Sequence, residues 1–537
     1  MLEITLSVKN KYIDKSKEFL DKYILLILIG ALTAISIVYF VTYLNNGLGL
    51  AYNDARSHLD IGRRVVEGLK PGLAQLGSVW LPLPHLLMVP TIWNDYFWHS
   101  GLSGALQSMI SFVATAIIIH FFLKEMGVSI FGRLVGVMVF VANLNILYLQ
   151  SIAMTELLLI ATMTAGVYEL YLWHKNGQIL NIIKSSFWIM MASLIRYEGW
   201  FLMLYAGVLI IIEVFKRKGF KSAEGTAVFY ATLAAFGVFL WFLWNLLIFK
   251  DPLYFILGPF SAKAQQDQLE AAGVLITKSN LLLSIKIYLY ALFYNSYTIP
   301  AILALFGAIL YWTDKKIKPG LKIAITALFA PLMFNILALY LGHSVLFIQG
   351  ISGTSWFNVR YGIMMMPSIS IFIGYLVSRI KDFRWVIVGI LLFITYFAFS
   401  NYDAVTIDDA RVGSSQKNVS EVSGYLAQNS ANEKGFILVS AASHDAIIFS
   451  SGLPMKRFIH EGTGAYWESA TTSPDSWARW IIMRTNDDND LVWRSVSRVP
   501  AFDNYILVAS YPFADIYEIK QELIGQLHTE PVLGKQK

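Results

Sequence analysis

Long apolar runs, separated by short charged segments, are the feature that most constrains how this chain can fold. About 20 consecutive apolar residues are needed to span a bilayer as an α-helix. The sequence of 537 residues is 56% hydrophobic and only 15% charged, whereas soluble domains carry about 25% charged residues. The sequence therefore predicts a polytopic α-helical membrane protein with enough length left over for a soluble domain.

We expect about eleven transmembrane helices, because that many runs approach the length of a span. The fifth run is short, and the eighth is long enough to tilt or break near Pro300. The predicted spans lie approximately at 22–43, 103–123, 133–149, 156–173, 183–195, 200–215, 226–249, 283–311, 321–342, 361–379 and 384–400. Together they define a predicted membrane domain over residues 22–400, which follows a polar N-terminal segment (1–21).

Lysines and arginines gather in six junctions between these runs, and cytoplasmic loops of membrane proteins carry such an excess. The six junctions are Lys9 to Lys22, Lys124 to Arg133, His174 to Lys184, Lys216 to Lys221, Lys315 to Lys322, and Arg379 to Arg384. With eleven spans, all six lie on one side of the membrane. This pattern predicts a multi-pass plasma-membrane protein with residues 1–21 in the cytoplasm, a long first outer loop (44–102) and an outer C-terminus.

The net charge of +6 is explained by these basic loops, so it does not indicate a nucleic-acid partner. The chain contains no cysteine, which excludes disulfides, thiolate metal sites and cysteine nucleophiles. The lack of cysteines also fits a prokaryotic plasma membrane better than a eukaryotic secretory membrane.

The composition changes after residue 400, where three short apolar runs have the pattern of buried strands. The expected strands are GFILVS (435–440), WIIMRT (480–485) and YILVAS (505–510). Helices are expected at 416–429 and 487–498, and alternating strands and helices indicate an α/β layer. Residues 401–537 are therefore predicted to form an extracytoplasmic α/β domain. Within it, HEGTGAYW (460–467) is either an acceptor-binding loop or a turn of the folded domain.

The stretch YNDARSHLDIGRRV (52–65) begins the first outer loop with an unusual pattern. Asn53 is a good helix N-cap, and Asp54 in the first turn is favourable there. Because residues four apart share one helix face, Asp54 and His58 point together. The apolar stripe of the same helix is Leu59, Gly62, Val65, Val66 and Leu69. We expect an amphipathic helix lying in the membrane interface, in which Asp54 either supports the helix start or belongs to a site.

The other outer turns also carry charged or polar residues at membrane depth, where such residues are costly and usually functional. These residues are Glu156, Arg196, Glu198, His343, Arg360 and Tyr361. Two simpler interpretations stay open: Arg196 and Glu198 could pair only with each other, and Arg360 could be an interfacial anchor. The inner loops, in contrast, carry ordinary exposed lysines and arginines.

Carboxylates, arginines and histidines at one water–lipid boundary suit a substrate with a phosphate headgroup and a lipid tail. Arginine binds phosphate through two parallel hydrogen bonds, and a nearby carboxylate can accept the proton of an attacking hydroxyl. The loop 251–273, which contains Lys263, either covers such a site or is an inert interface helix. His85, in WLPLPHLLMVP (80–90), is predicted to be a structural interface residue.

At these residues the chain resembles the GT-C integral-membrane glycosyltransferases, specifically the branch of protein O-mannosyltransferases and aminoarabinose transferases. The resemblance covers about residues 20 to 400. The family's first-loop acid matches Asp54 within NDARSH, although many relatives carry Asp-Glu where this chain has Ala55. The second acid matches Glu156, and the phosphate-binding arginine matches Arg360. RYEGW (196–200) is similar to a turn of prokaryotic members.

The resemblance implies an inverting transferase that uses a polyprenyl-phosphate sugar as donor at the outer membrane face. Asp54 would be the general base, while Glu156 and His58 would orient it or the acceptor. The implied phosphate- and substrate-binding residues are Arg360, Arg196, Glu198, Tyr361, His343 and Lys263. This branch does not generally need a metal, although Asp54, His58 and Glu156 could together supply ligands for a divalent ion.

The acceptor could be a glycan, a lipid or a protein, and two other classes of protein stay open. One is a transporter or flippase of lipid-linked sugars, against which the one-sided placement of charge argues. The other is a sensor or scaffold in which the C-terminal domain is the working part. The oligosaccharyltransferase branch is disfavoured, because its Trp-Trp-Asp motif does not occur in residues 401–537.

Overall fold

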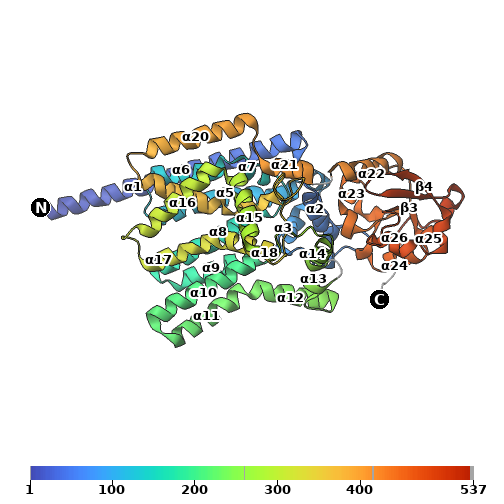
Figure 1. Ribbon diagram of the computed structural model, residues 1–537, viewed down its shortest axis with the longest axis horizontal. Coiled ribbons are helices and arrows are strands. Elements are labelled where there is room, and N and C mark those ends of the chain that lie inside the picture. Colours follow the sequence, from blue (N-terminus) through green and yellow to red (C-terminus); the bar gives the residue numbers. More distant parts are fainter. Residues whose placement is uncertain (1, 259–260, 414–415, 532–537) are drawn as a thin grey trace.

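The computed structural model describes residues 2–258, 261–413 and 416–531. The molecule is elongated: a bundle of helices fills most of its length, the start of helix α1 projects at one end, and the strands lie at the other (Figure 1). Helix α2 (Asn53–Val66) lies where the bundle meets the strand-containing C-terminal region (Figure 1). The opening segment of the first predicted outer loop therefore occupies the boundary between the two parts.

Six segments of the described chain are long and apolar enough to cross a membrane, or up to eight if each of two bent helix pairs is one span. The six are Tyr23–Asn45 within α1 (Leu2–Asn45), Leu102–Glu125 (α5), Glu198–Lys218 (α10), Pro319–Tyr340, Val359–Arg379 and Arg384–Arg411. Each of the eleven predicted spans coincides with a helix or a helix pair. How many of them cross the membrane stays a prediction, as do the domain limits 22–400 and 401–537.

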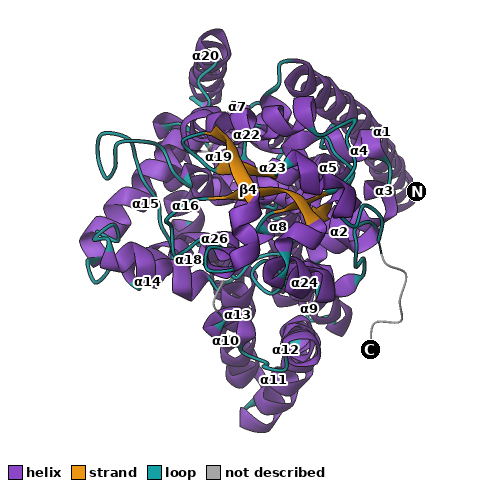
Figure 2. Cartoon of the chain, turned by 90° about the vertical axis from the view of Figure 1, so that its right-hand side faces the viewer, coloured by secondary structure: helices purple, strands orange, loops and turns teal. Residues whose placement is uncertain are grey.

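Helices α17 to α20 belong to the last three of these six segments, and the rest of the helices before the C-terminal region are shorter, less apolar or bent into pairs. Figure 2 shows α11 and α12 extending away from the main group. Besides α1, α2, α5 and α10, the helices are α3 (Leu83–Ile92), α4 (Asp95–His99), α6 (Ile130–Val141), α7 (Leu144–Leu149), α8 (Glu156–Asn176), α9 (Ile179–Ser193), α11 (Phe220–Ala234), α12 (Phe236–Phe249), α13 (Tyr254–Leu257), α14 (Ala262–Ala271), α15 (Leu281–Ser296), α16 (Thr298–Thr313), α17 (Pro319–Ala324), α18 (Ala330–Tyr340), α19 (Met366–Arg379), α20 (Arg384–Asn401) and α21 (Val405–Asp408).

The predicted break near Pro300 is confirmed. Helices α15 and α16 meet at an angle of 105°, and the residue between them, Tyr297, has a φ of 61°. Proline lacks an N–H donor and fixes its own φ, so it is tolerated in the first turn of a helix but not in the interior. Pro300 lies in the first turn of α16, which explains why one apolar run of this length forms two helices.

Helices α6 and α19 approach closely because glycines face each other across their contact. A Cβ atom built on Gly132 would lie 2.6 Å from the carbonyl oxygen of Gly374, and one on Gly136 would lie 2.9 Å from that of Ser370. Small residues at such contacts allow membrane helices to pack backbone to backbone.

We therefore expect Gly132→Ala to lower the free energy of unfolding by about 1–3 kcal/mol, the usual cost of overpacking. Gly389→Ala is the matched control, because nothing lies within 4 Å of a Cβ at that exposed position of α20. The check is the unfolding of both variants in lipid. Equal stabilities would contradict the close approach of α6 and α19.

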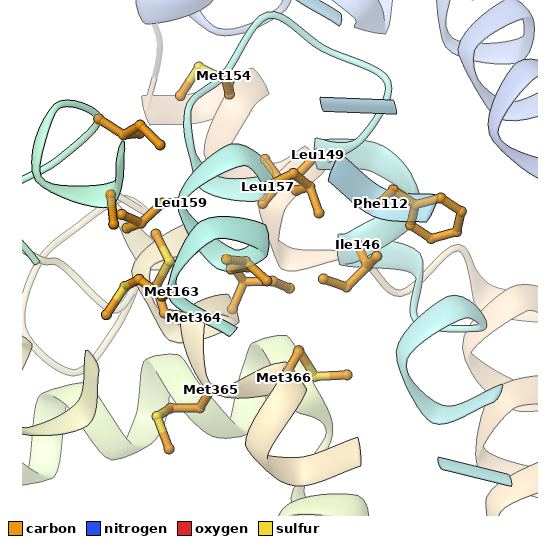
Figure 3. Packing of buried hydrophobic residues seen from close by; sticks show 14 of the residues in the cluster. Phe112, Ile146, Leu149, Met154, Leu157, Leu159, Met163, Met364, Met365 and Met366 are labelled. Carbon is orange, nitrogen blue, oxygen red and sulfur yellow. The ribbon is translucent and has the colours of Figure 1, made fainter. Parts of the chain in front are cut away.

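Near the end of the bundle that contains α2, the first turns of α8 pack in an apolar cluster that includes three consecutive methionines. Figure 3 shows Leu157, Leu159 and Met163 of α8 near Met364 and Met365. All of these side chains are buried. The chain segment that contains Arg360 is thus packed against the helix that Glu156 begins.

The C-terminal region contains a five-stranded sheet with the order β2-β1-β3-β5-β4. The strands β1, β2 and β3 are parallel, whereas β5 pairs antiparallel with both β3 and β4. The strands are β1 (Phe436–Leu438), β2 (Phe458–Ile459), β3 (Ala478–Met483), β4 (Tyr505–Ser510) and β5 (Asp515–Ile519). The helices are α22 (Gln416–Asn429), α23 (Ala441–Ser451), α24 (Ala465–Thr472), α25 (Pro474–Trp477) and α26 (Leu491–Val496).

The three predicted strands coincide with β1, β3 and β4, but the prediction that all three are buried is wrong. Strand β4 is an edge of the sheet, and its Ile506 and Leu507 are exposed. Strands β2 and β5 were not predicted: β2 has only two residues, and β5 carries a mixture of polar and apolar residues.

The helix predicted from residues 52–65 is present as α2, but its predicted position in the membrane interface is wrong. Helix α2 forms, with Tyr52 instead of Asn53 as its N-cap. Every residue from 55 to 64 is buried, because α3 covers one side of the helix and α23 another. Protein, not lipid, covers this helix.

Candidate functional site

Arg360 joins the ends of three separate segments at the end of the bundle that contains α2. It lies in the 3-10 helix η4 (Val359–Met365), which leads into α19. Its Nη2 donates to Asp54 Oδ2 at 2.6 Å, and its Nε donates to Glu156 Oε1 at 3.0 Å. Asp54 is in the first turn of α2, and Glu156 is the first residue of α8. Negative side chains are stabilised at such helix N-termini, so both acids are held in place by their helices as well as by Arg360.

A second arginine completes the cluster. Arg196 donates to Glu198 Oε1 at 3.0 Å through Nη2, and its Nη1 lies 3.4 Å from Glu156 Oε1. The predicted pairing of Arg196 with Glu198 is present, but it is not the only contact of Arg196, because Glu156 accepts from both arginines. The guanidinium of Arg196 lies 4.8 Å from the ring centre of Tyr361, in the geometry of a cation–π contact.

Asp54 differs from the other carboxylates of the cluster in its accessibility. Its side chain is 43% exposed, whereas those of Glu156 and Glu198 are 0% and 3% exposed. In the described residues, Glu156 Oε2 is buried without a hydrogen-bond partner. Asp54 is thus the carboxylate that a reactant could reach.

Asp54 and the two arginines line a small cavity of about 80 Å³. Its walls are Asp54, His58, Trp80, Leu81, Met154, Thr155, Ile195, Arg196, Arg360 and Tyr361. Five residues that the sequence singled out, Asp54, His58, Arg196, Arg360 and Tyr361, therefore share one cavity. Glu156 and Glu198 lie next to it through their arginine contacts.

His58 lines the cavity and is uncharged. Its Nδ1 lies 2.8 Å from His85 Nε2, and its ring packs 4.3 Å from that of Trp80. Burial, together with the charges of Arg196 and Arg360, lowers the pKa of His58 to about 3. His58 is therefore a neutral imidazole at pH 7. His85, predicted as an interface residue, is instead fully buried as the partner of His58.

Asp409 is a member of the cluster that the sequence did not reveal. It follows α20 and α21, where the chain turns back to the site, and its Oδ2 lies 3.8 Å from Arg360 Nη1. Tyr52 OH donates to Asp409 Oδ2 at 3.0 Å and to the carbonyl oxygen of Thr406 at 2.8 Å. The only signal in the sequence is the pair of acids in TIDDARVG (406–413), close behind the last apolar run.

We expect Tyr52→Phe to lower the free energy of unfolding by roughly 1–3 kcal/mol, because a buried acceptor loses its donor. Tyr52 is 3% exposed, and its hydroxyl tethers the returning segment to α2. Tyr402→Phe is the control, since Tyr402 is 85% exposed. Thermal unfolding of both variants in lipid checks the expectation, and an unchanged Tyr52→Phe would show that the tether contributes nothing.

Two predicted site residues do not join the cluster. Lys263 is exposed on α14, and His343 accepts a hydrogen bond from Gln266 of the same helix through its carbonyl oxygen at 2.6 Å. Lys263 is thus part of α14, and His343, which follows α18, contacts that helix. Their roles in binding stay predictions.

The ligand set suggested for a divalent ion does not fit this geometry. Arg360 stands between Asp54 and Glu156, and His58 Nδ1 is already turned toward His85. Among the described residues, no group of three or more His, Cys, Asp or Glu side chains is arranged to hold a metal.

Comparison with known proteins gives a match in structure only. No protein-family description and no curated protein matches the sequence. The structure of ArnT from Cupriavidus metallidurans in the apo state aligns with a TM-score of 0.56 at 10% identity, covering 91% of this chain and 98% of ArnT. The structure of the same ArnT bound to undecaprenyl phosphate aligns with a TM-score of 0.52 at 11% identity, with the same coverage. The resemblance predicted from the outer-face residues is thus confirmed at the level of fold: this chain has the GT-C membrane fold of the aminoarabinose transferase ArnT.

Proposed function

We propose that this chain is an inverting glycosyltransferase that moves a sugar from a polyprenyl-monophosphate carrier to an acceptor hydroxyl at the outer membrane face. The observation that carries the proposal is the contact of the accessible carboxylate Asp54 with the buried guanidinium of Arg360 in the wall of a cavity. The shared fold supports it, because the ArnT structure was determined with undecaprenyl phosphate bound.

Asp54 is proposed as the general base. Its side chain is accessible, while the neighbouring carboxylates are buried and bonded to arginines. Asp54 Oδ accepts the proton of the acceptor hydroxyl as its oxygen attacks the anomeric carbon. The bond from that carbon to the phosphate oxygen breaks at the opposite face, and the phosphate leaves with the electron pair. The anomeric configuration is therefore inverted.

Arg360 and Arg196 are proposed to bind the phosphate. A guanidinium presents five N–H donors in a plane and matches phosphate through two parallel bonds. Nη1 and Nη2 of Arg360 each carry two hydrogens, and the structure assigns one carboxylate contact to each nitrogen. One hydrogen on each of these nitrogens is therefore left to bond to the phosphate oxygens, while Asp54 and Asp409 keep their contacts with Arg360.

The remaining cavity residues are proposed to orient the reactants. Neutral His58 offers a donor or an acceptor to a hydroxyl without adding a charge beside Asp54. Glu156 keeps both arginines in position through Oε1. Tyr361 packs against the guanidinium groups of both arginines. This packing fixes the orientation in which the two groups bind the phosphate.

We also propose the setting of the reaction from the sequence. The protein lies in a prokaryotic plasma membrane, with residues 1–21 in the cytoplasm and residues 401–537 outside. Its partners are the sugar carrier, membrane lipids and an acceptor that is a glycan, a lipid or a protein.

The test is turnover of a panel of polyprenyl-phosphate monosaccharides by the purified protein in lipid nanodiscs, with and without a chelator. We expect one donor to be consumed, with release of polyprenyl phosphate and an inverted product or free sugar. If no donor is consumed even when candidate acceptors of all three classes are supplied, the proposal is wrong.

One observation favours a second function, the transport of lipid-linked sugars. The structure contains two bent helix pairs, α11–α12 at 48° and α15–α16 at 105°, and broken helices form the binding sites of many transporters. A transporter would move a labelled sugar lipid between the leaflets of a vesicle without cleaving it. Cleavage in the turnover assay would separate the two functions.

A further inference from the structure

A second and larger cavity, of about 460 Å³, lies between α2, the loop that follows it and the C-terminal region. Its lining residues are Ser57, Ile61, Arg64, Ala74, Gln75, Leu76, Gly77, Ser78, Val79, Trp80, Phe249, Tyr254, Ala441, Ala442, Asp445, His460, Glu461 and Gly462. Trp80 also lines the cavity that contains Asp54. The two cavities therefore meet at one tryptophan and share α2 as a wall.

Polar groups with unused hydrogen-bonding capacity face this second cavity. Asp445 accepts from Ser57 Oγ at 2.7 Å through Oδ1 and from the backbone N–H of Ala446, and its carboxylate lines the cavity. Arg64 is 9% exposed, and its Nε has no hydrogen-bond partner among the described residues. A buried donor without a partner costs free energy, so a ligand that bonds to Arg64 would remove that cost. The two side chains carry opposite charges, and the pair suits a neutral ligand with several hydroxyls.

Aromatic rings supply the rest of the binding surface. Phe249 and Tyr254 are stacked with parallel planes and ring centres 4.4 Å apart. Trp80 is held by its packing against His58. All three side chains are partly exposed. Small-molecule sites combine apolar and aromatic walls with a few placed polar groups, and a sugar ring offers both an apolar C–H face and a rim of hydroxyls.

We propose that this cavity binds a saccharide as the acceptor, with one hydroxyl directed past Trp80 toward Asp54. The proposal rests on the proposed glycosyl transfer and names the class of its acceptor. The saccharide could be free or could be the headgroup of a lipid, since both present the same ring and hydroxyls. Asp445 and Arg64 bond to hydroxyls away from the reacting one, and the aromatic rings pack against the faces of the sugar.

The lining of the cavity does not suit an extended peptide. Peptides that bind sheets add a strand to an exposed edge, but the lining residues come from helices and turns and include none of the strands β1 to β5. The exposed side chains of the edge strand β4, Ile506 and Leu507, do not line the cavity. A protein acceptor is therefore the alternative that the experiment has to exclude.

The experiment measures saccharide binding directly, with no donor present. The full-length protein in nanodiscs is mixed with chitobiose, maltose or a serine-containing hexapeptide, and magnetisation transfer to each probe is recorded by NMR. We expect at least one disaccharide to bind and the peptide not to bind. Asp445→Asn should weaken saccharide binding about tenfold, the loss expected for one hydrogen bond to a charged group.

Two further variants make the result specific to the cavity. Tyr254→Ala removes an aromatic face and should also weaken binding. Asp488→Asn is the matched control, because Asp488 is exposed in the same C-terminal region and does not line the cavity. Asp445→Asn can still accept the hydrogen bond from Ser57, and thermal unfolding of Asp445→Asn and Asp488→Asn shows that both variants are folded.

Three results would each overturn the proposal. The peptide binds and the saccharides do not, no probe binds at millimolar concentration, or Asp445→Asn and Asp488→Asn affect saccharide binding equally. Competition by a monoglucosyl diacylglycerol in the disc would identify a lipid-linked saccharide, and lack of competition a free one. Because no donor is needed, these results do not depend on whether the proposed transfer itself is correct.

Discussion

Asp54→Asn should reduce turnover of the sugar donor by about 10²–10⁴, the usual contribution of a general base. Asparagine has nearly the same shape as aspartate and can accept the hydrogen bond from Arg360 Nη2. It cannot take up the proton of the acceptor hydroxyl. The loss should therefore fall on kcat, with little change in the affinity for the carrier lipid. The measurement is donor turnover in nanodiscs, together with binding of the polyprenyl phosphate.

Asp267→Asn is the matched control for this experiment, since Asp267 is exposed on α14 and does not line the cavity. It should turn over the donor at the parent rate. If Asp54→Asn also turned over normally while expressed and folded, the assignment of Asp54 as base would be wrong. A loss of kcat accompanied by unfolding would mean instead that the ion pair with Arg360 is structural.

Arg360→Met should have the largest effect on stability and abolish binding of the carrier phosphate. Removing one partner of a buried ion pair typically costs about 3–5 kcal/mol, because the other charge is left uncompensated. Here Glu156 and Asp409 are 0% and 2% exposed, and both face Arg360. We expect a clear decrease in the free energy of unfolding, measured by denaturation in lipid.

Arg360→Lys separates binding from folding. A lysine keeps the positive charge, so much of the stability should return, but it lacks the planar set of donors that matches a phosphate. Binding of polyprenyl phosphate should therefore stay weak. Arg498→Met, at an exposed position of the C-terminal region, should change neither property. Full phosphate binding by Arg360→Lys would show that Arg360 supplies only charge.

The sequence predicted those parts of the fold and of the site that depend on local pattern. Asp54 and His58, four residues apart on one helix, do line the same cavity. Glu156 does begin a helix, and the long apolar run does break near Pro300. Each of these features follows from helix periodicity, helix-end chemistry or proline geometry, which act within a few residues.

The contacts that assemble the site could not be predicted in this way. Arg360 meets Asp54 and Glu156 across 306 and 204 residues of chain. Asp409 was missed because an acid behind the last apolar run has the same pattern as one in an exposed tail. The sequence wrongly predicted that α2 lies in the membrane interface, because its amphipathic pattern shows only which face of the helix is apolar. It does not show whether lipid or protein covers that face.

The position of Asp409 has a consequence for how the protein is made. Asp54 and Glu156 have already left the ribosome when Arg360 is synthesised, so two of its counter-charges precede it. Asp409 follows 49 residues later, behind the last apolar helix α20. The neighbourhood of Arg360 is therefore completed only when the final hydrophobic segment has been inserted and the chain behind it has folded back. A nascent chain arrested before that point should remain incompletely assembled, which would make it recognisable to quality-control proteases of the membrane.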